Sequence, residues 1–548
     1  MRVGIRGTTD VMKTTIRAAL WLALVPFLPA QANEALLRHN CGACHSDPAN
    51  PEAPLSRISE QRKSPEGWEM TLQRMQTVHG VQFSDPEGKA DASGVLFQLV
   101  KHLSDTHGLA PAETAGFRYT LERRHNTVDV PEDAEYAVMC TRCHSNARVA
   151  LQRRTEPEWR NLIHFHLAQF PTTEYQIGGR DRQWFPIALE RTLPMLAAAY
   201  PLQTTEWAAW QQTAKPALAG RWRVTGRMPG KGDFDGVMTA EVGDADSYSV
   251  ALTGTFSTGE AVEMDGHSVV YTGFEWRANL EGDAAAGGPG YLQVLEASAD
   301  GSTLSGRMFP PEHPERGIDI QARRDDGTPR LLAVSPAQLK RGGTSTIRLS
   351  GSALSGAPAL GQGIRVVRTV SRDADSVVLE VSADADAAVG VRDLAVGKST
   401  LPAALTVFDN VDRVEVWPAY SVGRVGGNGG SQPEVQGRFE AIAWADGPDG
   451  QANTPDDLRI GPVKAAWSVA PWNEKAAEDR DVEFAGSMDK DTGVFTPAAA
   501  GPNPARKQST NNAGNLKVIA TVGEGEAALS GEAQLLVTVQ RWINPPLW

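Results

Sequence analysis

A Cys-x-x-Cys-His motif occurs twice in this chain, and the two copies contain all four of its cysteines. The first copy reads CGACH and spans Cys41–His45, and the second reads CTRCH and spans Cys140–His144. This spacing is typical of c-type haem attachment, in which two thiols bond to one porphyrin and the adjacent histidine ligates the iron. The predicted covalent attachment residues are Cys41, Cys44, Cys140 and Cys143. The predicted proximal iron ligands are His45 and His144.

Three other chemistries also use paired cysteines. A zinc site made of the four thiols would leave the histidine after each pair unexplained. A dithiol redox pair needs a thioredoxin-like βαβ context, which the sequence does not show. Plain disulfides would form in an oxidising compartment. Two complete motifs with no spare cysteine favour two covalent haems over these alternatives.

The sixth iron ligands are predicted from a second repeated pattern. Trp68 follows the first motif and Trp159 follows the second, and seven residues after them stand Met75 and His166. Seven residues are about two helical turns, so each tryptophan shares a helix face with the residue seven positions later. We therefore predict that Met75 ligates the first iron and that His166 ligates the second.

Other side chains compete for these positions. The rivals are His79, His102 and His107 for the first iron, and His164 and Met195 for the second. Because His164 and His166 are two residues apart on a helix, only one of them can face the iron. Trp68 and Trp159 are expected to pack near the porphyrin edge or simply in the core. The arginines that either pair with haem propionates or lie on a solvated surface are Arg123, Arg124, Arg142, Arg153 and Arg154.

The change of ligand from methionine to histidine predicts two different haem potentials. A thioether ligand tends to raise a haem potential more than a second imidazole does. A first haem held by His45 and Met75 would therefore have a higher potential than a second haem held by two histidines. We expect electrons to run from the second haem to the first and then out of the chain.

The N-terminus is predicted to be a secretory signal. Lys13 and Arg17 supply positive charge, and Ala18–Ala30 is an apolar run too short to span a bilayer comfortably. Small residues at Ala30–Ala32 fit a cleavage site, which predicts a signal peptide over 1–32 and a periplasmic chain with no membrane span. The formal net charge of −13 argues against a nucleic-acid partner, because phosphate binding needs clustered lysines and arginines.

The expected fold class is multidomain α plus β. A mainly helical dihaem cytochrome c domain is predicted over 33–214, as two tandem units of about 33–125 and 126–214. After it, short alternating runs separated by Gly and Asp turns indicate strands. In the first β-region these runs are Arg221–Met228, Ser247–Phe256, Ser268–Leu280, Gly290–Ala297, Thr303–Phe309 and Gly317–Arg323.

Three β-domains are predicted from these runs. They are a β-barrel of about seven strands over 215–326, an immunoglobulin-like β-sandwich over 327–408 and a second such sandwich over 409–548. No nucleophile elbow, phosphate loop or zinc-protease motif occurs in them. The Asp-rich stretch Asp446–Leu458 is either a Ca²⁺ loop or an ordinary polar turn.

The haem motifs and the order of domains resemble the large, alpha subunit of quinohemoprotein amine dehydrogenase. The resemblance covers essentially the whole mature chain. It rests on the domain order and on the phrases CGACHS, RMQTVHG, CTRCHS and GRMFPPEHPERGID, the last at Gly306–Asp319.

This resemblance implies a periplasmic heterotrimer with a β-propeller subunit and a small subunit that carries cysteine tryptophylquinone. The quinone would oxidise a primary amine to an aldehyde and ammonia, and the haems of this chain would pass the electrons to a soluble copper protein or cytochrome c. The chain itself would have no catalytic residue. The family's one bis-His haem and one His/Met haem match His166 and Met75.

Three rival functions come from other classes. The chain would be a stand-alone dihaem electron carrier with β-sandwich docking domains, a peroxidase-like enzyme with an open iron, or a haem-dependent sensor. Isolation as a monomer would favour the first rival, and high-spin iron in the resting protein would favour the second.

Overall fold

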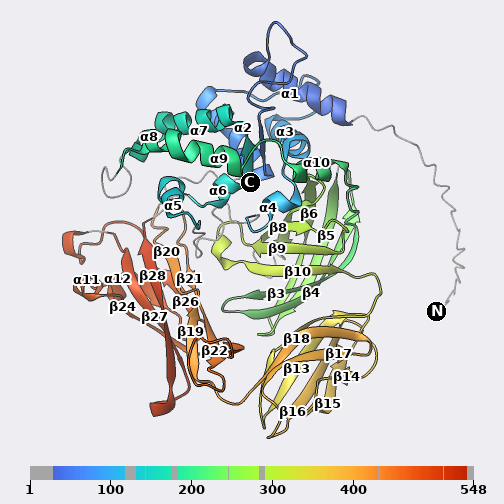
Figure 1. The fold of residues 1–548 in the computed structure, drawn as a ribbon, viewed down its shortest axis with the longest axis vertical. Coiled ribbons are helices and arrows are strands. Elements are labelled where there is room, and N and C mark those ends of the chain that lie inside the picture. The colour runs from blue at the N-terminus through green and yellow to red at the C-terminus, as the bar shows by residue number, and fades with distance from the viewer. Residues whose placement is uncertain are drawn as a thin grey trace, which may run out of the picture.

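The computed structural model describes residues 29–117, 131–141, 144–174, 182–244, 246–282, 290–429, 432–509 and 511–539. A helical N-terminal region is followed by a β-barrel and two further β-rich parts (Figure 1). The predicted fold class, a helical domain followed by three β-domains, is confirmed. The predicted signal peptide lies almost wholly outside the described residues, which begin at Pro29 within the first helix.

The helical region consists of two successive groups of elements. The first group is α1 (Pro29–His45), β1 (Gln61–Lys63), α2 (Pro65–His79), α3 (Ala92–His107) and α4 (Pro111–Thr114). The second group is α5 (Ala134–Cys140), α6 (Ala147–Ala150), β2 (Gln152–Arg154), α7 (Glu156–Gln169), η1 (Pro171–Glu174), α8 (Trp184–Ile187), η2 (Ala188–Thr192), α9 (Leu193–Ala199) and α10 (Thr205–Gln212). Each group has its own apolar core, one around Trp68 and the other around Trp159.

The two groups start their central helices in the same way. Ser64 caps α2 by accepting a hydrogen bond from the Gly67 N–H, and Thr155 caps α7 by accepting one from the Glu158 N–H. Both helices have a proline in the first turn, where its missing N–H costs nothing. Thr155 stands 91 residues after Ser64, and the same spacing separates the two central tryptophans. The internal repeat is therefore visible in the helix starts themselves.

The two groups meet through the short strands β1 and β2, which pair antiparallel. Arg62 stands opposite Arg153, and these two residues are again 91 positions apart. A residue that pairs with its own counterpart marks a local two-fold axis, so the two groups face each other around this pair.

A single carboxylate neutralises the buried arginines at this axis. Arg62 and Arg153 are 3% and 7% exposed, and Glu113 is 6% exposed. Arg62 donates to both carboxylate oxygens of Glu113 at 2.8 and 2.9 Å, and Arg153 Nε lies 3.1 Å from Glu113 Oε1. Burial alone would raise the pKa of Glu113, but the hydrogen bonds and charge of Arg62 and then the charge of Arg153 hold it below its ordinary value.

The Glu113→Gln variant should destabilise the helical region by about 3–5 kcal/mol, because it leaves two buried guanidinium groups without a counterion. Because the folded pKa of Glu113 is depressed, its stabilisation is present at neutral pH and is lost as pH falls through that pKa. Urea unfolding followed by tryptophan fluorescence measures the change. Glu156→Gln, at a 56% exposed side chain paired with Arg160, is the matched control. Equal losses of unfolding free energy in Glu113→Gln and Glu156→Gln would contradict this account.

The first β-part is a closed barrel with strand order β10-β3-β4-β5-β6-β7-β8-β9. Its strands are β3 (Gly220–Met228), β4 (Gly232–Val242), β5 (Ser247–Phe256), β6 (Ala261–Tyr271), β7 (Glu275–Gly282), β8 (Tyr291–Ala297), β9 (Thr303–Phe309) and β10 (Ile318–Arg324). Its interior is filled by apolar side chains that include Trp222, Trp276 and Met238. Figure 1 shows the helical region lying over one side of this barrel.

The barrel has one strand more than the seven expected. Strand β4 was not predicted, although Phe234, Met238 and Ala240 alternate inward along it. The run Ser268–Leu280 is two strands, because the chain turns at Thr272 and Gly273, where both residues have positive φ angles of 57° and 78°. Glycine adopts this backbone conformation at no steric cost.

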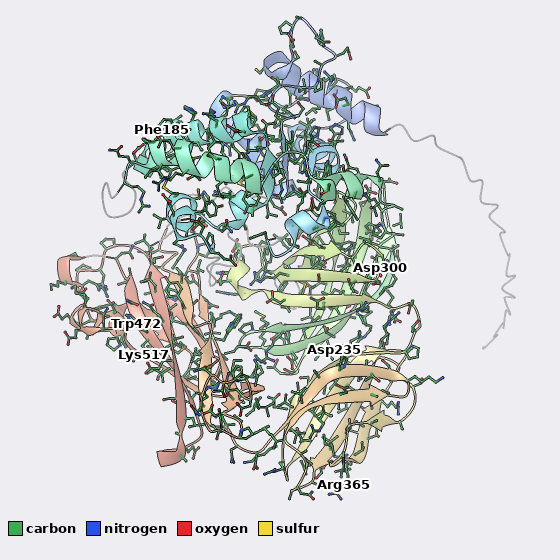
Figure 2. The ribbon with its side chains drawn as sticks, in the orientation of Figure 1. Phe185, Asp235, Asp300, Arg365, Trp472 and Lys517 are labelled. Atoms are coloured by element: carbon green, nitrogen blue, oxygen red, sulfur yellow. The ribbon has the colours of Figure 1, made fainter. Side chains whose placement is uncertain are left out.

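The second β-part is a sandwich of two four-stranded sheets, β11-β13-β16-β15 and β12-β18-β17-β14. Its strands are β11 (Arg330–Ser335), β12 (Gln338–Lys340), β13 (Thr344–Ser352), β14 (Pro358–Ala359), β15 (Ile364–Arg372), β16 (Ser376–Ala383), β17 (Gly390–Val396) and β18 (Ser399–Phe408). Asp235 of the barrel lies on the side that faces this sandwich (Figure 2) and accepts a hydrogen bond from Ser350 Oγ at 2.8 Å.

The third β-part has sheets β19-β22-β23, β20-β28-β27-β24 and β21-β26-β25. Its elements are β19 (Arg413–Trp417), β20 (Tyr420–Arg424), β21 (Gly437–Arg438), β22 (Glu440–Ala445), β23 (Leu458–Val463), β24 (Ala466–Pro471), α11 (Glu474–Glu478), α12 (Asp481–Phe484), β25 (Gly486–Met488), β26 (Val494–Pro497), β27 (Gly514–Val522) and β28 (Leu529–Thr538). Arg227 of the barrel joins it by an ion pair to Glu440 at 2.7 Å.

A buried charge cluster joins the helical region to the barrel. Glu66, in the first turn of α2, accepts a hydrogen bond from Arg277 Nε of β7 at 2.5 Å. Glu275 lies 3.3 Å from the same guanidinium and is 1% exposed. Burial, together with the charges of Glu66 and Glu296, raises the pKa of Glu275 to about 8, although Arg277 opposes the shift. Glu275 therefore holds a proton near neutral pH.

The raised pKa of Glu275 predicts a stability that falls as pH rises. An unfolded glutamate loses its proton near pH ~4.3, so between that pH and about 8 the folded chain binds a proton that the unfolded chain has released. Glu275→Gln should flatten this part of the profile. Thermal unfolding at a series of pH values measures it, and Glu241→Gln, on an exposed part of β4, is the control. An unchanged slope in Glu275→Gln would contradict the assignment.

Of the helices in the described part of the chain, none is long and apolar enough to cross a membrane.

Candidate functional site

Both Cys-x-x-Cys-His motifs begin near the C-terminal end of a helix. Cys41, Cys44 and His45 occupy the last turn of α1, and Cys140 is the last residue of α5. Cys143 lies outside the described residues. Cys41 borders the apolar core around Trp68, and Cys140 borders the core around Trp159. Each motif is thus placed where a flat apolar ring would meet one core.

Burial favours the protonated thiol at Cys41 and Cys140. Cys41, Cys44 and Cys140 form no disulfide within the described residues. Burial, and then the neighbouring Cys44, raises the pKa of Cys41 to about 11, and burial raises the pKa of Cys140 to about 12. Thiolates are the form that exchanges disulfides, so burial disfavours this chemistry at Cys41 and Cys140.

Both motif histidines use Nδ1 for a backbone hydrogen bond. His45 Nδ1 donates to the Ser56 carbonyl oxygen at 3.0 Å, and His144 Nδ1 donates to the Ser145 carbonyl oxygen at 3.0 Å. Metal-ligating histidines commonly donate their other ring N–H in this way, which fixes the tautomer and directs Nε2 to the metal. Burial lowers the pKa of His45, so its imidazole is neutral at physiological pH.

The structure brings His166 to His144. Their ring centres are 6.4 Å apart, with the planes inclined by 49°. Two imidazoles that ligate one metal from opposite sides at about 2 Å place their ring centres roughly 6 Å apart. His166 Nδ1 donates to the Leu162 carbonyl oxygen at 2.8 Å, and burial lowers the pKa of its imidazole. The pair fits an iron held between two histidines.

The two rivals for the second iron are placed differently. His164 is exposed on the same helix, and its ring packs edge-on against Phe185 at 5.1 Å. Figure 2 shows Phe185 on the outer side of the helical region. Met195 of α9 packs against the apolar core of its group. Neither is paired with His144 as His166 is.

The first iron has a less complete set of neighbours. Met75 is half-buried on α2 and lies outside the apolar core around Trp68. His79 is exposed one helical turn further on, and its charge acts on the pKa of His45. His102 is buried beside Glu34 at 3.3 Å, and His107 packs edge-on against Trp68. Met75 thus stays our prediction for this iron, with His79 as its nearest rival.

The structure also shows where the two central tryptophans and two of the predicted propionate partners lie. Trp68 and Trp159 are each 1% exposed, and their Nε1–H groups donate to the carbonyls of His107 and Tyr200. They are core residues. Arg153 pairs with Glu113 and Arg154 lies 3.6 Å from Glu158. Arg123, Arg124 and Arg142 lie outside the described residues.

Four family models match the chain in sequence order. The model for the haem-binding part of the quinohemoprotein amine dehydrogenase alpha subunit matches residues 31–207. Models for domains II, III and IV of that subunit match residues 215–325, 328–409 and 414–547. The chain belongs to the quinohemoprotein amine dehydrogenase alpha-subunit family. The resemblance seen in the sequence is confirmed, and the helical region is the haem-binding part of an amine dehydrogenase subunit.

Similarities to solved structures are weak. A redesigned β-barrel, mFAP1, bound to DFHBI is 17% identical, with 20% of this chain and 94% of that chain covered and a TM-score of 0.17. Drosophila N-cadherin EC1-3 is 10% identical, with 45% and 85% covered and a TM-score of 0.20. These scores are too low to support any argument about this chain. No match was found among curated proteins.

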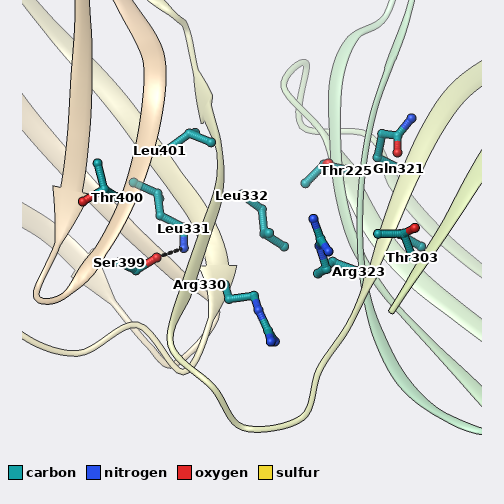
Figure 3. A pocket seen from close by; sticks show the side chains of 11 residues that line it. Thr225, Thr303, Gln321, Arg323, Arg330, Leu331, Leu332, Ser399, Thr400 and Leu401 are labelled. Atoms are coloured by element: carbon teal, nitrogen blue, oxygen red, sulfur yellow. Dashed lines mark hydrogen bonds between the residues drawn. The ribbon is translucent and has the colours of Figure 1, made fainter. Parts of the chain in front are cut away.

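Clefts lie where the barrel meets the sandwich and where it meets the third β-part. A cleft of about 460 Å³ lies between the barrel and the sandwich, where Arg323 and Arg330 are among the lining residues and the Leu331 N–H donates to Ser399 Oγ (Figure 3). A cleft of about 620 Å³ lies between the barrel and the third β-part and includes Trp417. Neither is lined by a residue of the helical region.

The Asp-rich stretch Asp446–Leu458 is organised around an arginine. The guanidinium of Arg413 lies 3.0 Å from Asp446 and 2.5 Å from Asp457. This side chain provides the positive charge that a bound Ca²⁺ would otherwise provide. The stretch therefore fits the polar-turn interpretation, since two of its carboxylates, Asp446 and Asp457, already have a cation.

Sequence reasoning missed the charged residues between the two groups of helices. Arg62, Lys63 and Glu113 are buried there, and Arg74 stacks on Phe165 at 4.6 Å. The repeated phrases QRKSPEGW and QRRTEPEW, at Gln61–Trp68 and Gln152–Trp159, were the available signal, because basic residues directly before each helix start recur at the same spacing.

The ligand arrangement predicts opposite results for two neighbouring histidines. His166→Ala should convert the second haem from low-spin to partly high-spin iron, because it removes one of two facing imidazoles. His164→Ala, at an exposed site two residues away, is the matched control and should leave the spectrum unchanged. Electron paramagnetic resonance of the oxidised protein measures both. A changed spectrum in His164→Ala alone would assign the ligand to His164 instead.

Proposed function

We propose that this chain carries electrons through two covalent c-type haems, from a quinone on a partner subunit to a soluble acceptor. The quinone, cysteine tryptophylquinone, would oxidise a primary amine to an aldehyde and ammonia on that partner. The acceptor would be a copper protein or a cytochrome c. The family match to an amine dehydrogenase subunit with a haem-binding part supports this proposal.

The observation that carries the proposal is the pair of facing imidazoles. His144 lies between α5 and α6 and His166 lies on α7, yet their ring centres are 6.4 Å apart and each Nδ1 is engaged by a backbone carbonyl. Two imidazoles with this separation of ring centres, and with Nε2 left for a metal, match an iron with two imidazole ligands. A haem bound here would supply one-electron chemistry.

The remaining site residues have supporting roles. Cys41, Cys44, Cys140 and Cys143 would fix two porphyrins by thioether bonds, so that the cofactors stay attached in both oxidation states. His45 and Met75 would ligate the first iron, and the Met75 sulfur would give that haem the higher reduction potential. Electrons would then pass from the second haem to the first.

The location and partners follow from the same proposal. The predicted signal peptide over 1–32 would direct the chain to the periplasm. There the chain would bind its haems and join a heterotrimer. A β-propeller subunit and the small quinone-bearing subunit would complete the enzyme. The three β-parts, which lack any recognised catalytic motif, would serve as docking surfaces.

An optical experiment tests the electron-transfer role. The chain is purified from its native periplasm with whatever proteins accompany it, oxidised, and mixed with a simple primary amine. We expect the haem absorption bands to become reduced promptly, and the reduction to stop when the accompanying subunits are stripped away. The control is the stripped chain reduced by dithionite, which shows that its haems remain reducible.

A preparation of the intact chain without companions, and without amine-dependent reduction, would contradict the proposal. It would favour the stand-alone dihaem carrier.

A further inference from the structure

A set of buried cations lies between the two groups of helices. Lys63 on β1 and Arg154 on β2 are counterparts in the repeat and are 4% and 5% exposed. Each stacks over the central tryptophan of its own group: Lys63 Nζ is 4.9 Å from the ring centre of Trp68, and Arg154 Cζ is 5.6 Å from that of Trp159. Two positive charges are therefore placed symmetrically at the junction.

A third cation connects the two ligand helices. Arg74 of α2 directly precedes Met75, and Phe165 of α7 directly precedes His166. The Arg74 guanidinium lies 4.6 Å from the centre of the Phe165 ring. The helices that carry the two candidate sixth ligands thus touch immediately beside those ligands.

These cations have too few carboxylates around them. Lys63 Nζ donates to Thr71 Oγ1 at 2.5 Å, and within the described residues no carboxylate lies within 4 Å of Lys63 or Arg74. Arg154 shares Glu158 with Arg57, whose Nε lies 2.8 Å from that carboxylate. Glu158 therefore serves two of these four cations, and within the described residues Lys63 and Arg74 have no carboxylate at ion-pair distance. Because a buried charge without a counterion costs several kcal/mol, such a cluster calls for further anions.

The cluster lies beside a candidate ligand of each iron. Burial lowers the pKa of Lys63 well below its ordinary value, and Arg154 and Arg74 lower it further, so these groups are close together. Arg74 directly precedes Met75 on α2 and contacts Phe165, which directly precedes His166 on α7. Lys63 and Arg154 contact Trp68 and Trp159 on the same two helices.

We propose that Lys63, Arg74 and Arg154 form one shared cluster that binds carboxylates of both haems and couples their reduction potentials. This inference rests on the proposed function, because it requires two haems. Haem propionates are the anions that this function brings to the junction, and ammonium and guanidinium groups bind carboxylates by charge-assisted hydrogen bonds. Arg153 is not part of the cluster, because its guanidinium lies 3.1 Å from Glu113 and also donates to the carbonyls of Ala150 and Gln152.

The sign of the effect follows from charge alone. Reduction lowers the positive charge at the iron by one unit, so nearby cations favour the reduced form and raise the potential. Removing one cation, or exposing a propionate charge that it neutralised, should lower the potential. Because the cluster is shared, the loss of a single cation should affect both haems.

The test is a spectroelectrochemical titration of the intact, haem-loaded chain. In Arg74→Gln, both midpoint potentials should shift downward while low-spin spectra show that the iron ligands are retained. Lys63→Gln removes a different charge from the same cluster and should give the same downward shift of both midpoints. Lys63→Arg keeps the charge and should restore them. Arg160→Gln, at a 48% exposed cation on α7, removes one charge outside the cluster and should leave both midpoints unchanged.

Two results would overturn the shared cluster. If the midpoint potentials of Arg74→Gln and Lys63→Gln both equal those of Arg160→Gln, the cations do not affect the haem potentials. A shift confined to one haem would show that the cluster is not shared. A purified chain without covalent haem would overturn the proposed function together with this inference, whereas two haems with unmoved midpoints would overturn the inference alone.

Discussion

The pairing of Arg62 and Arg153 with Glu113 is the interaction on which the helical region depends. Both arginines are buried at a local two-fold axis, where like charges would repel without the carboxylate between them. Arg62 also donates to the carbonyls of Gly108 and Leu202, one from each group of helices. The junction between the two groups is therefore polar and directional, which fixes their orientation more tightly than an apolar contact would.

The barrel extends this fixed arrangement to the rest of the molecule. It contacts the helical region through Arg277 and Glu66, the sandwich through Asp235 and Ser350, and the third β-part through Arg227 and Glu440. The segment Gly306–Asp319 contributes as well, because the Gln436 N–H donates to Glu315 of this segment. Each contact pairs a charged group with a polar partner on a neighbouring part. The chain thus has a central barrel with three attached parts (Figure 1).

Local patterns in the sequence were enough to find the helices that carry the predicted haem ligands. The cysteine motifs and the seven-residue step from tryptophan to Met75 or His166 are short-range features, and the helices α2 and α7 follow from their caps and periodicity. Strand β4 escaped prediction because Gly232, Asp233 and Asp235 resemble turn residues although the inward positions alternate correctly. The domain boundaries expected at 215, 327 and 409 stay predictions.

The pairing of residues that lie far apart in the chain could not be predicted from the sequence. Glu113 is 51 residues from Arg62 and 40 from Arg153, and nothing in the local pattern distinguishes it from a surface glutamate. The approach of His166 to His144 likewise depends on how the segment between them, which includes α6 and β2, folds. The ion pairs of Arg413 with Asp446 and Asp457 also join distant segments, so the Asp-rich stretch could not be interpreted without the structure.

The central claim is that one chain holds two covalently attached haems on either side of the polar junction. The most direct measurement is the intact mass of the purified mature chain under denaturing conditions, which remove haem that is bound only by its iron ligands. The account predicts a mass equal to the polypeptide plus two haem groups. The mass of the bare polypeptide, or of the polypeptide with a single haem, would contradict it.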